Sequence, residues 1–236
     1  MVWDEARLLA LEVDAIYGLV PRPGGGLPVI VKNPAVRAVW AWSPQARLLA
    51  LGAGVSSRGH EDGGGPEFAP GEPPAPLVRL AASIAERPLT VEGGPCFVFP
   101  ERLTASRPVP LPILVPTDEG RRAARHLVRP DNWQPGEWHA LLGGRMGPWA
   151  MAVYDGEPVS ICFSPASNAT ASEAGIWARA DFRGRGLAPA VVAAWAAYER
   201  RTKEVLFYST TAANHASQSV ARRLGLTPLG WIWTVR

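Results

Sequence analysis

The sequence has few residues of the types that bind metals or cross-link a chain. Among its 236 residues only Cys96 and Cys162 are cysteines, and both stand among apolar residues. This excludes a disulfide framework and a cysteine-based zinc cluster, and it favours a reducing cytoplasm. The 4 histidines are scattered without metal-ligand spacing, so we expect no metal.

Long apolar runs are also missing. The longest, Leu187 to Tyr198, is too short to span a bilayer. Asp4 and Glu5 stand before any apolar run, which is wrong for a signal peptide. We therefore expect a soluble, cytoplasmic protein that has no membrane partner.

Lysine is nearly absent, because the 24 basic residues are arginines except for Lys32 and Lys203. The formal net charge is only +3. Such a charge fits a small polyanionic ligand or a weak nucleic-acid surface. Most of the 10 tryptophans lie in apolar segments, where core packing is a better explanation than base stacking. Nucleic-acid binding is therefore the least favoured of the functions considered.

Glycine and proline, by contrast, are abundant, with 24 of each, and most of them fall in the first 148 residues. We divide the chain into a loop-rich α+β domain, residues 1–105, and a second domain, residues 106–236. The first domain is predicted to hold helices and strands, separated by an irregular Gly- and Pro-rich loop over residues 52–76. The predicted helices are Trp3 to Tyr17 and Leu77 to Glu86, and the strands are Val29 to Val31, Val36 to Trp42, Ala46 to Leu51 and Cys96 to Phe99.

The second domain has a more regular pattern. Asp155-Gly156 joins two apolar segments and predicts a hairpin with a two-residue turn. The order from Thr117 is α-α-β-β-β-α-β-α-β. The elements are helices Thr117 to Val128 and Pro135 to Leu142, hairpin strands Trp149 to Tyr154 and Pro158 to Phe163, strand Glu173 to Ala180, helix Gly186 to Arg201, strand Val205 to Ser209, helix Asn214 to Leu224 and strand Gly230 to Val235.

The segment from Arg183 to Ala188 lies between a predicted strand and a helix that is apolar on nearly every side. Gly184 and Gly186 allow a sharp turn and a close approach of the backbone to a ligand. The free N–H groups and the dipole of the helix start favour an anion, and Arg183 and Arg185 add positive charge. The segment alone fits either a pyrophosphate cradle or a plain strand-to-helix turn in an arginine-rich protein.

Two motifs together resemble the GNAT superfamily of acyl-CoA-dependent N-acetyltransferases, in its two-part bacterial form with an N-terminal extension. Arg183-x-x-Gly186-x-Ala188 matches the acyl-CoA signature of that family. Asn214-His215-Ala216-Ser217, followed by Leu224-Gly225-Leu226, is similar to its second motif. Both motifs lie in the corresponding positions of the predicted order of elements.

The resemblance implies an α/β fold with a mixed, mostly antiparallel central sheet and flanking helices, and acetyl-CoA as acyl donor. The strand before the signature would hold the pantetheine arm through backbone groups, and the signature loop would hold the pyrophosphate. The implied coenzyme-binding residues are Ile176, Trp177, Ala178, Arg183, Gly184, Arg185, Gly186, Leu187, Ala188 and Asn214. Asn214 is equally suited to cap the helix that it precedes.

The resemblance also implies direct attack of an amine on the thioester, with a carboxylate as base. Glu173 is the candidate base because it begins the acyl-facing strand. A tyrosine often found seven residues after the motif asparagine is Ala221 here, so the general acid is open. Ser217, Tyr208 or a water are the candidates, and Ser217 is equally suited to completing a helix cap.

The sequence thus predicts an N-acetyltransferase that moves an acetyl group from acetyl-CoA to a primary amine of a small molecule or peptide. A non-catalytic acyl-CoA-binding or sensor protein is an alternative, since the usual tyrosine is missing. The N-terminal region would shape the acceptor site or contribute to a homodimer. The acceptor amine and the acyl chain length stay open.

Overall fold

The computed structural model describes residues 4–22, 26–56, 69–84, 89–103 and 108–236. The chain divides into two compact units. Unit 1 comprises Met1–Phe97, Ser209–Gln218 and Pro228–Arg236, and unit 2 comprises Val98–Tyr208 and Ser219–Thr227. The predicted division into a domain of residues 1–105 and a domain of residues 106–236 stays a prediction.

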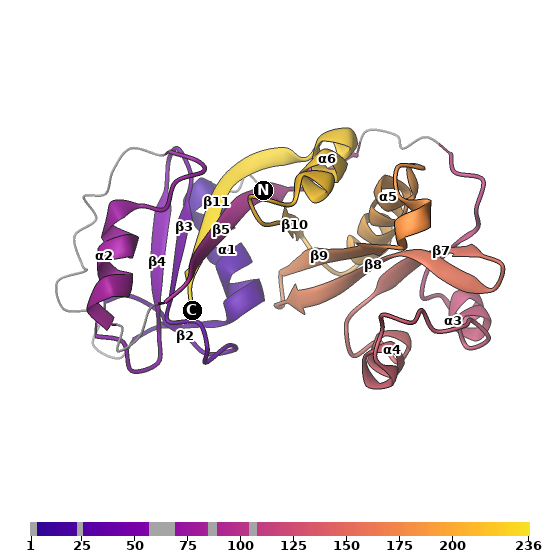
Figure 1. The fold of residues 1–236 in the computed structure, drawn as a ribbon, viewed down its shortest axis with the longest axis horizontal. Coiled ribbons are helices and arrows are strands. Elements are labelled where there is room, and N and C mark those ends of the chain that lie inside the picture. Colours follow the sequence, from indigo (N-terminus) through magenta and orange to yellow (C-terminus); the bar gives the residue numbers. More distant parts are fainter. Residues whose placement is uncertain (1–3, 23–25, 57–68, 85–88, 104–107) are drawn as a thin grey trace. The chain divides into compact units, whose positions relative to one another are not determined.

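Unit 1 is built around a sheet whose strands follow the order β1-β2-β4-β3-β11-β5. β2 and β4 are parallel, whereas β11 runs antiparallel to β3, with Trp231 opposite Trp42 and Val235 opposite Ala38. The last strand of the chain therefore completes the sheet of the first unit (Figure 1). The elements are α1 (Glu5–Tyr17), β1 (Leu19–Val20), β2 (Val29–Ile30), β3 (Ala38–Trp42), β4 (Arg47–Gly52), α2 (Ala75–Ile84), β5 (Val91–Val98) and β11 (Thr227–Val235).

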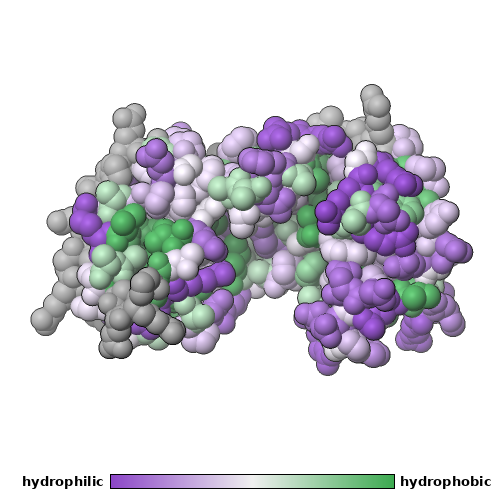
Figure 2. All heavy atoms as spheres, in the orientation of Figure 1, coloured by the Kyte–Doolittle hydropathy of each residue, from purple (hydrophilic) through white to green (hydrophobic). Residues whose placement is uncertain are grey.

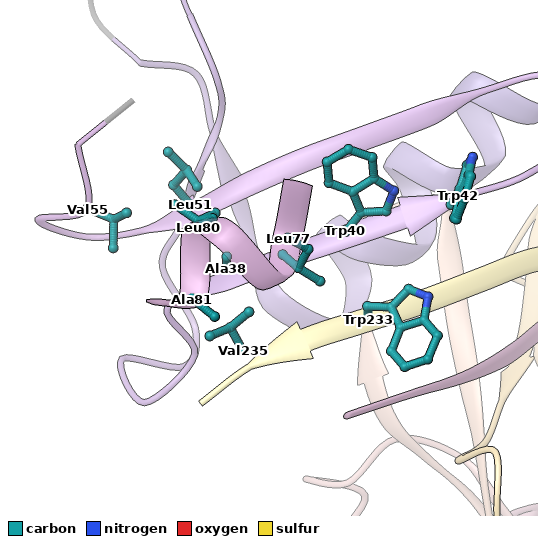
Figure 3. Close-up of a cluster of buried hydrophobic side chains, with 10 residues drawn as sticks. All are labelled: Ala38, Trp40, Trp42, Leu51, Val55, Leu77, Leu80, Ala81, Trp233 and Val235. Atoms are coloured by element: carbon teal, nitrogen blue, oxygen red, sulfur yellow. The ribbon is translucent and has the colours of Figure 1, made fainter. Parts of the chain in front are cut away.

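The core of unit 1 joins indole rings from β3 and β11 to the apolar face of α2. Figure 3 shows Trp40 and Trp233 beside Leu77, and all three are buried. The pair Trp40–Trp42 packs edge to face, with ring centroids 6.4 Å apart. Fully burying a leucine side chain contributes about 1.5 to 3 kcal/mol relative to leaving it exposed, so the cluster stabilises unit 1.

Two local features of unit 1 follow from the sequence, and one does not. Asp4 caps α1 by accepting a hydrogen bond from the Arg7 N–H at 2.7 Å, and Gly18 after the helix has a positive φ. β5 begins at Val91, five residues earlier than predicted, and includes Gly93 and Gly94. Glycine and proline disfavour strands, so the early part of β5 has no local signal.

Unit 2 is a sheet with the strand order β10-β9-β8-β7-β6, in which only β9 and β10 are parallel. This confirms the predicted mixed, mostly antiparallel sheet with flanking helices. The elements are β6 (Ile113–Leu114), α3 (Asp118–Ala124), α4 (Pro135–Leu142), β7 (Trp149–Tyr154), β8 (Glu157–Ser167), β9 (Ala171–Ala178), a 3-10 turn (Ala180–Phe182), α5 (Leu187–Glu199), β10 (Val205–Ser209) and α6 (His215–Leu224).

Helices cover both faces of the unit 2 sheet. Trp177 of β9 packs with the aromatic cluster that joins α4 to β7, whereas Ser172 of β9 bonds to Glu199 of α5. Because side chains alternate between the faces of a strand, residues 172 and 177 point to opposite faces. α5 therefore covers one face, and α3 and α4 lie on the other. Hydrophilic residues dominate the surface over α3 and α4 in Figure 2.

The turn between β7 and β8 forms as predicted. Asp155 and Gly156 both have positive φ, 50° and 74°, which is the backbone of a tight hairpin turn. α3 is shorter than predicted and ends at Ala124 rather than at about Val128. The N–H of Val128 instead donates to the carbonyl of Gly156 at 2.9 Å, a contact distant in sequence.

Candidate functional site

The most distinctive feature of unit 2 is a fork between its two parallel strands. β9 and β10 pair over only three positions, the last of which is Glu173 opposite Phe207. β9 continues to Ala178, while its other edge stays paired with β8. Beyond Glu173, one edge of β9 therefore has no strand partner among the described residues.

Strand alternation determines which backbone groups face this open edge. The N–H of Arg179 donates to the carbonyl of Val159 on β8, and the Trp177 carbonyl accepts from Ser160 Oγ at 3.2 Å. Odd-numbered residues of β9 thus direct their backbone groups to β8. The N–H and C=O groups of Ile176 and Ala178 point to the open edge. Of the three strand residues predicted to hold the coenzyme, Trp177 has its backbone turned the other way.

The glycine loop follows directly from this strand. Gly184 and Gly186 have φ of 77° and 78°, and a Cβ atom at either position would meet no atom within 4 Å. Glycine is favoured at both positions because the backbone is left-handed there, and not because neighbouring atoms leave no space for a side chain. The open space beside both positions leaves room for a ligand to approach the backbone.

Residues 184 to 188 leave their backbone donors unused. Their N–H groups donate no backbone hydrogen bond within the described part of the chain. Gly186 begins α5 without a side-chain cap, so the positive end of the helix dipole is also uncompensated. Pro189 lacks an N–H, which costs nothing in the first turn. Free N–H groups at a helix start are suited to an anion, so a pyrophosphate cradle stays the prediction for this loop, beside the plain strand-to-helix turn.

A cation–aromatic stack fixes the base of this loop. The guanidinium groups of Arg179 and Arg185 each lie 4.5 Å from the ring centroid of Phe182. Arg179 also pairs with Glu157 and Asp181, and the hydrogen bond from Arg179 lowers the pKa of Asp181. Arg183 is exposed, and its Nε donates to the Ala178 carbonyl at 3.3 Å. The two loop arginines therefore have different partners: Arg183 bonds to the backbone of β9, whereas Arg185 packs on the ring of Phe182.

Glu173, the predicted base, lies at the point where the fork opens. Its residue is only 5% exposed, and it stands on the sheet face opposite the one that carries Ser172. Burial of a carboxylate is costly unless hydrogen bonds or an opposite charge compensate it. The structure thus places the candidate base beside the open edge of β9.

A buried polar network on the other face of the fork was not predicted from the sequence. Glu199 of α5 is 1% exposed, and its Oε1 accepts hydrogen bonds from Ser164 of β8 and from Ser172 of β9, the latter at 2.9 Å. Trp195 Nε1 donates to Ser164 Oγ at 2.9 Å. The spacing of four residues between Trp195 and Glu199 is the signal that would have placed Glu199 on the buried helix face.

Both cysteines are buried, and neither forms a disulfide within the described residues. Burial raises the pKa of the Cys162 thiol well above its ordinary value, and the nearby carboxylates of Glu199 and Glu173 raise it further. A thiol of this kind is protonated and inaccessible, so Cys162 is a core residue.

The second predicted motif forms the start of α6. The Asn214 side chain accepts a hydrogen bond from the Ser217 N–H at 3.0 Å, which is a helix cap. Ser217 is 8% exposed, and Tyr208 of β10 is 1% exposed. Asn214 and Ser217 belong to unit 1 and the fork to unit 2, so their roles at the coenzyme stay predictions.

Two further observations concern ligands and membranes. Within the described ranges, no three His, Cys, Asp or Glu side chains lie together as a metal site would require. None of the described helices has the length and apolarity needed to cross a bilayer.

Comparison with known proteins finds a family for the part of the chain that holds the fork and the loop. Residues 114–227 match the family model described as the acetyltransferase (GNAT) domain. The matched range contains the fork, the glycine loop and α6. Residues 114–227 are therefore similar to a GNAT acetyltransferase domain, as the motifs predicted, and domains of this family transfer acyl groups. No curated protein matches the sequence.

Solved structures with a similar fold include bacterial GNAT proteins of low sequence identity. A GNAT-family acetyltransferase from Novosphingobium aromaticivorans is 18% identical with a TM-score of 0.45, over 62% of this chain and 64% of that one. A GNAT-family acetyltransferase from Colwellia psychrerythraea is 15% identical with a TM-score of 0.48, over 68% and 61%. This chain thus spans less than two thirds of the length of either protein.

Proposed function

We propose that this protein transfers an acetyl group from acetyl-CoA to a primary amine. The observation that carries the proposal is two sets of backbone donors that have no backbone partner among the described residues, at Ile176 and Ala178 on the open edge of β9 and at residues 184–188 in the loop that begins α5. A linear ligand with a peptide-like arm and a pyrophosphate is the chemical match for these two sets of donors.

The coenzyme would be held by two kinds of group. The backbone of Ile176 and Ala178 supplies donors and acceptors for the amides of the pantetheine arm. Arg183 and the N–H groups of residues 184–188 would hold the pyrophosphate, with Arg185 keeping the loop in position on Phe182. Asn214 is a further proposed contact. Trp177 is left out of the backbone contacts because its carbonyl faces β8.

The acyl transfer requires a base. A lysine-like amine with a pKa near 10.4 costs about 4 to 5 kcal/mol to deprotonate at pH 7. Glu173 would accept this proton, directly or through a water, as the amine forms a C–N bond to the acyl carbon. The C–S bond then breaks, and the thiolate takes a proton from Ser217, Tyr208 or a water. A backbone N–H of β9 would stabilise the oxyanion of the tetrahedral intermediate.

The acceptor is proposed to be an amine on a small molecule or peptide. Residues 1–105 would shape the acceptor site or support a homodimer. A cytoplasmic setting fits the two reduced, buried cysteines. No observation in the structure favours nucleic acid as a substrate over a small amine.

Coenzyme binding and turnover should be tested separately. At a hundred times Kd, acetyl-CoA should stabilise the protein by about 2.7 kcal/mol, or by about 5 to 10 °C in Tm. Release of free thiol is then followed over polyamines, amino acids, aminoglycosides and peptides. A shift together with thiol release supports the proposal, whereas a shift without release for any amine would favour an acyl-CoA sensor. No shift at millimolar acetyl-CoA would contradict both.

A further inference from the structure

Unit 1 contains a cavity of about 220 Å³ that the proposed reaction does not use. Its floor is the pair of strands β5 and β11, and its walls are the end of α1 and the segment from Ser209 to Thr211. Reciprocal backbone hydrogen bonds join Thr90 to Arg236. Thr234 Oγ1 donates to the Glu92 carbonyl at 3.3 Å, so the ladder continues toward Gly94.

Two glycines of β5 line this cavity, and each of them packs closely against another part of unit 1. A Cβ atom at Gly94 would lie 1.8 Å from the Thr210 carbonyl oxygen, and one at Gly93 would lie 2.3 Å from the ring of Trp233. Both distances are too short for any side chain, so the wall segment and the indole ring occupy the space that side chains would take. The two glycines therefore allow the segment from Ser209 to Thr211 and the Trp233 ring to pack directly against β5.

Every second residue of β11 lines the cavity: Ile232, Thr234 and Arg236. The intervening Trp233 packs into the hydrophobic core on the other face. Side chains of a strand alternate in this way, so the Arg236 side chain lies on the cavity face. Glu92 stands opposite Thr234 and shares that face.

Two opposite charges thus stand at diagonal positions on the cavity face. Cα atoms at such positions in an antiparallel pair are about 7 to 8 Å apart. Neither Glu92 nor Arg236 forms an ion pair within the described ranges, where the ion pairs are those of Arg179. Both residues are exposed, as rim residues of an open cavity would be.

The size and polarity of the cavity restrict what it can bind. Its volume is that of about seven water molecules at about 30 Å³ each, which suits a ligand of about six to ten non-hydrogen atoms. The Thr210 and Thr211 hydroxyl groups add neutral hydrogen-bonding capacity to the wall. A polyanion would be repelled by Glu92 and a polycation by Arg236.

We propose that this cavity is a binding site for a small zwitterion of the α-amino acid class, with Glu92 facing the ammonium group and Arg236 the carboxylate. The inference goes beyond the proposed acyl transfer, because binding here requires no residue of the fork. The two opposite charges would select ligands that carry both groups and reject those with either group blocked.

The test measures binding to the full chain without acetyl-CoA. The proteinogenic L-amino acids are screened by ligand-observed NMR, and the tightest binder is compared with its N-acetyl and its amide derivatives by calorimetry. We expect each blocked derivative to bind at least about tenfold more weakly, which is about 1.4 kcal/mol. Binding of no amino acid at about 10 mM, or equal binding of a blocked derivative, would overturn the proposal.

Variants then test which group of the ligand each of the two charged side chains binds. Glu92→Gln should weaken binding of the free amino acid about tenfold and leave binding of the N-acetyl derivative unchanged. Arg236→Gln should also weaken binding of the free amino acid about tenfold and leave binding of the amide derivative unchanged. Glu72→Gln and Arg79→Gln are matched controls, since both residues are exposed in unit 1 and do not line the cavity. Equal weakening by the controls would contradict the assignment. Because acetyl-CoA binding and turnover are measured separately, they can fail without affecting this result.

Discussion

The glycine loop offers a matched comparison that separates coenzyme binding from folding. Gly184 in the loop and Gly156 in the β7–β8 turn have φ of 77° and 74°, and a Cβ atom at either would meet nothing within 4 Å. Both residues belong to unit 2. Substitution by alanine should therefore have the same effect on folding at both positions.

The effect on folding is small and can be worked out. A left-handed backbone costs alanine about 1 to 2 kcal/mol. Alanine recovers about 0.4 to 1 kcal/mol because it restricts the unfolded chain. Each variant should thus lose between about 0 and about 1.6 kcal/mol of unfolding free energy, or at most about 6 °C in Tm.

Coenzyme binding should distinguish the two variants. In Gly184→Ala the added methyl group projects beside the free N–H groups where a pyrophosphate would approach, so acetyl-CoA should bind about tenfold more weakly, or by about 1.4 kcal/mol. Gly156→Ala should bind acetyl-CoA as the unaltered protein does. Calorimetry with acetyl-CoA measures both. Equal affinities in the two variants would refute the placement of the pyrophosphate at this loop.

Three other experiments test the candidate base, the buried polar network and the buried thiol of unit 2. Glu173→Gln should lower kcat about hundredfold or more while leaving KM for acetyl-CoA unchanged, and full turnover from about pH 6 to about pH 9 would exclude Glu173 as the base. Glu199→Ala removes the acceptor of the Ser172 hydroxyl and leaves the Ser164 hydroxyl only its 3.4 Å bond to the Pro148 carbonyl, so it should lower the unfolding free energy in urea by about 3 kcal/mol; a loss under about 1 kcal/mol would contradict the network, and Glu199→Gln should cost less. Because burial raises the pKa of Cys162, its thiol should stay protonated at about pH 8 and react with an aromatic disulfide only in denaturant, whereas rapid labelling of the native protein would show that it is accessible.

Features determined by local backbone chemistry could be predicted from the sequence. The Asp155-Gly156 turn, the Asp4 cap of α1 and the Asn214 cap of α6 each depend on residues within a few positions of one another. The glycine loop could also be predicted locally, because the glycines that allow positive φ and the residues that start the helix are adjacent in the sequence. The motifs for the family were local in the same sense.

Features that depend on distant contacts could not be predicted. Gly93 and Gly94 argue against a strand locally, but the ring of Trp233 and the Thr210 carbonyl occupy the space of their missing side chains. The bond from Ser172 to Glu199 joins residues 27 positions apart. The backbone of Trp177 faces β8, whereas the backbones of Ile176 and Ala178 face the open edge. This difference depends on the register of β8 against β9, because a shift of one residue would exchange the two edges for every residue of the strand.

Residue-resolved amide hydrogen exchange with and without acetyl-CoA tests the central claim most directly. The amides of Ile176, Ala178 and residues 184–188 have no partner strand or helix turn and should gain at least about tenfold protection when the coenzyme binds. Trp177, whose backbone faces β8, should be protected in both states. If the amides of Ile176, Ala178 and residues 184–188 exchange at the same rate in saturating acetyl-CoA as without it, the coenzyme does not bind along the fork and the account is wrong.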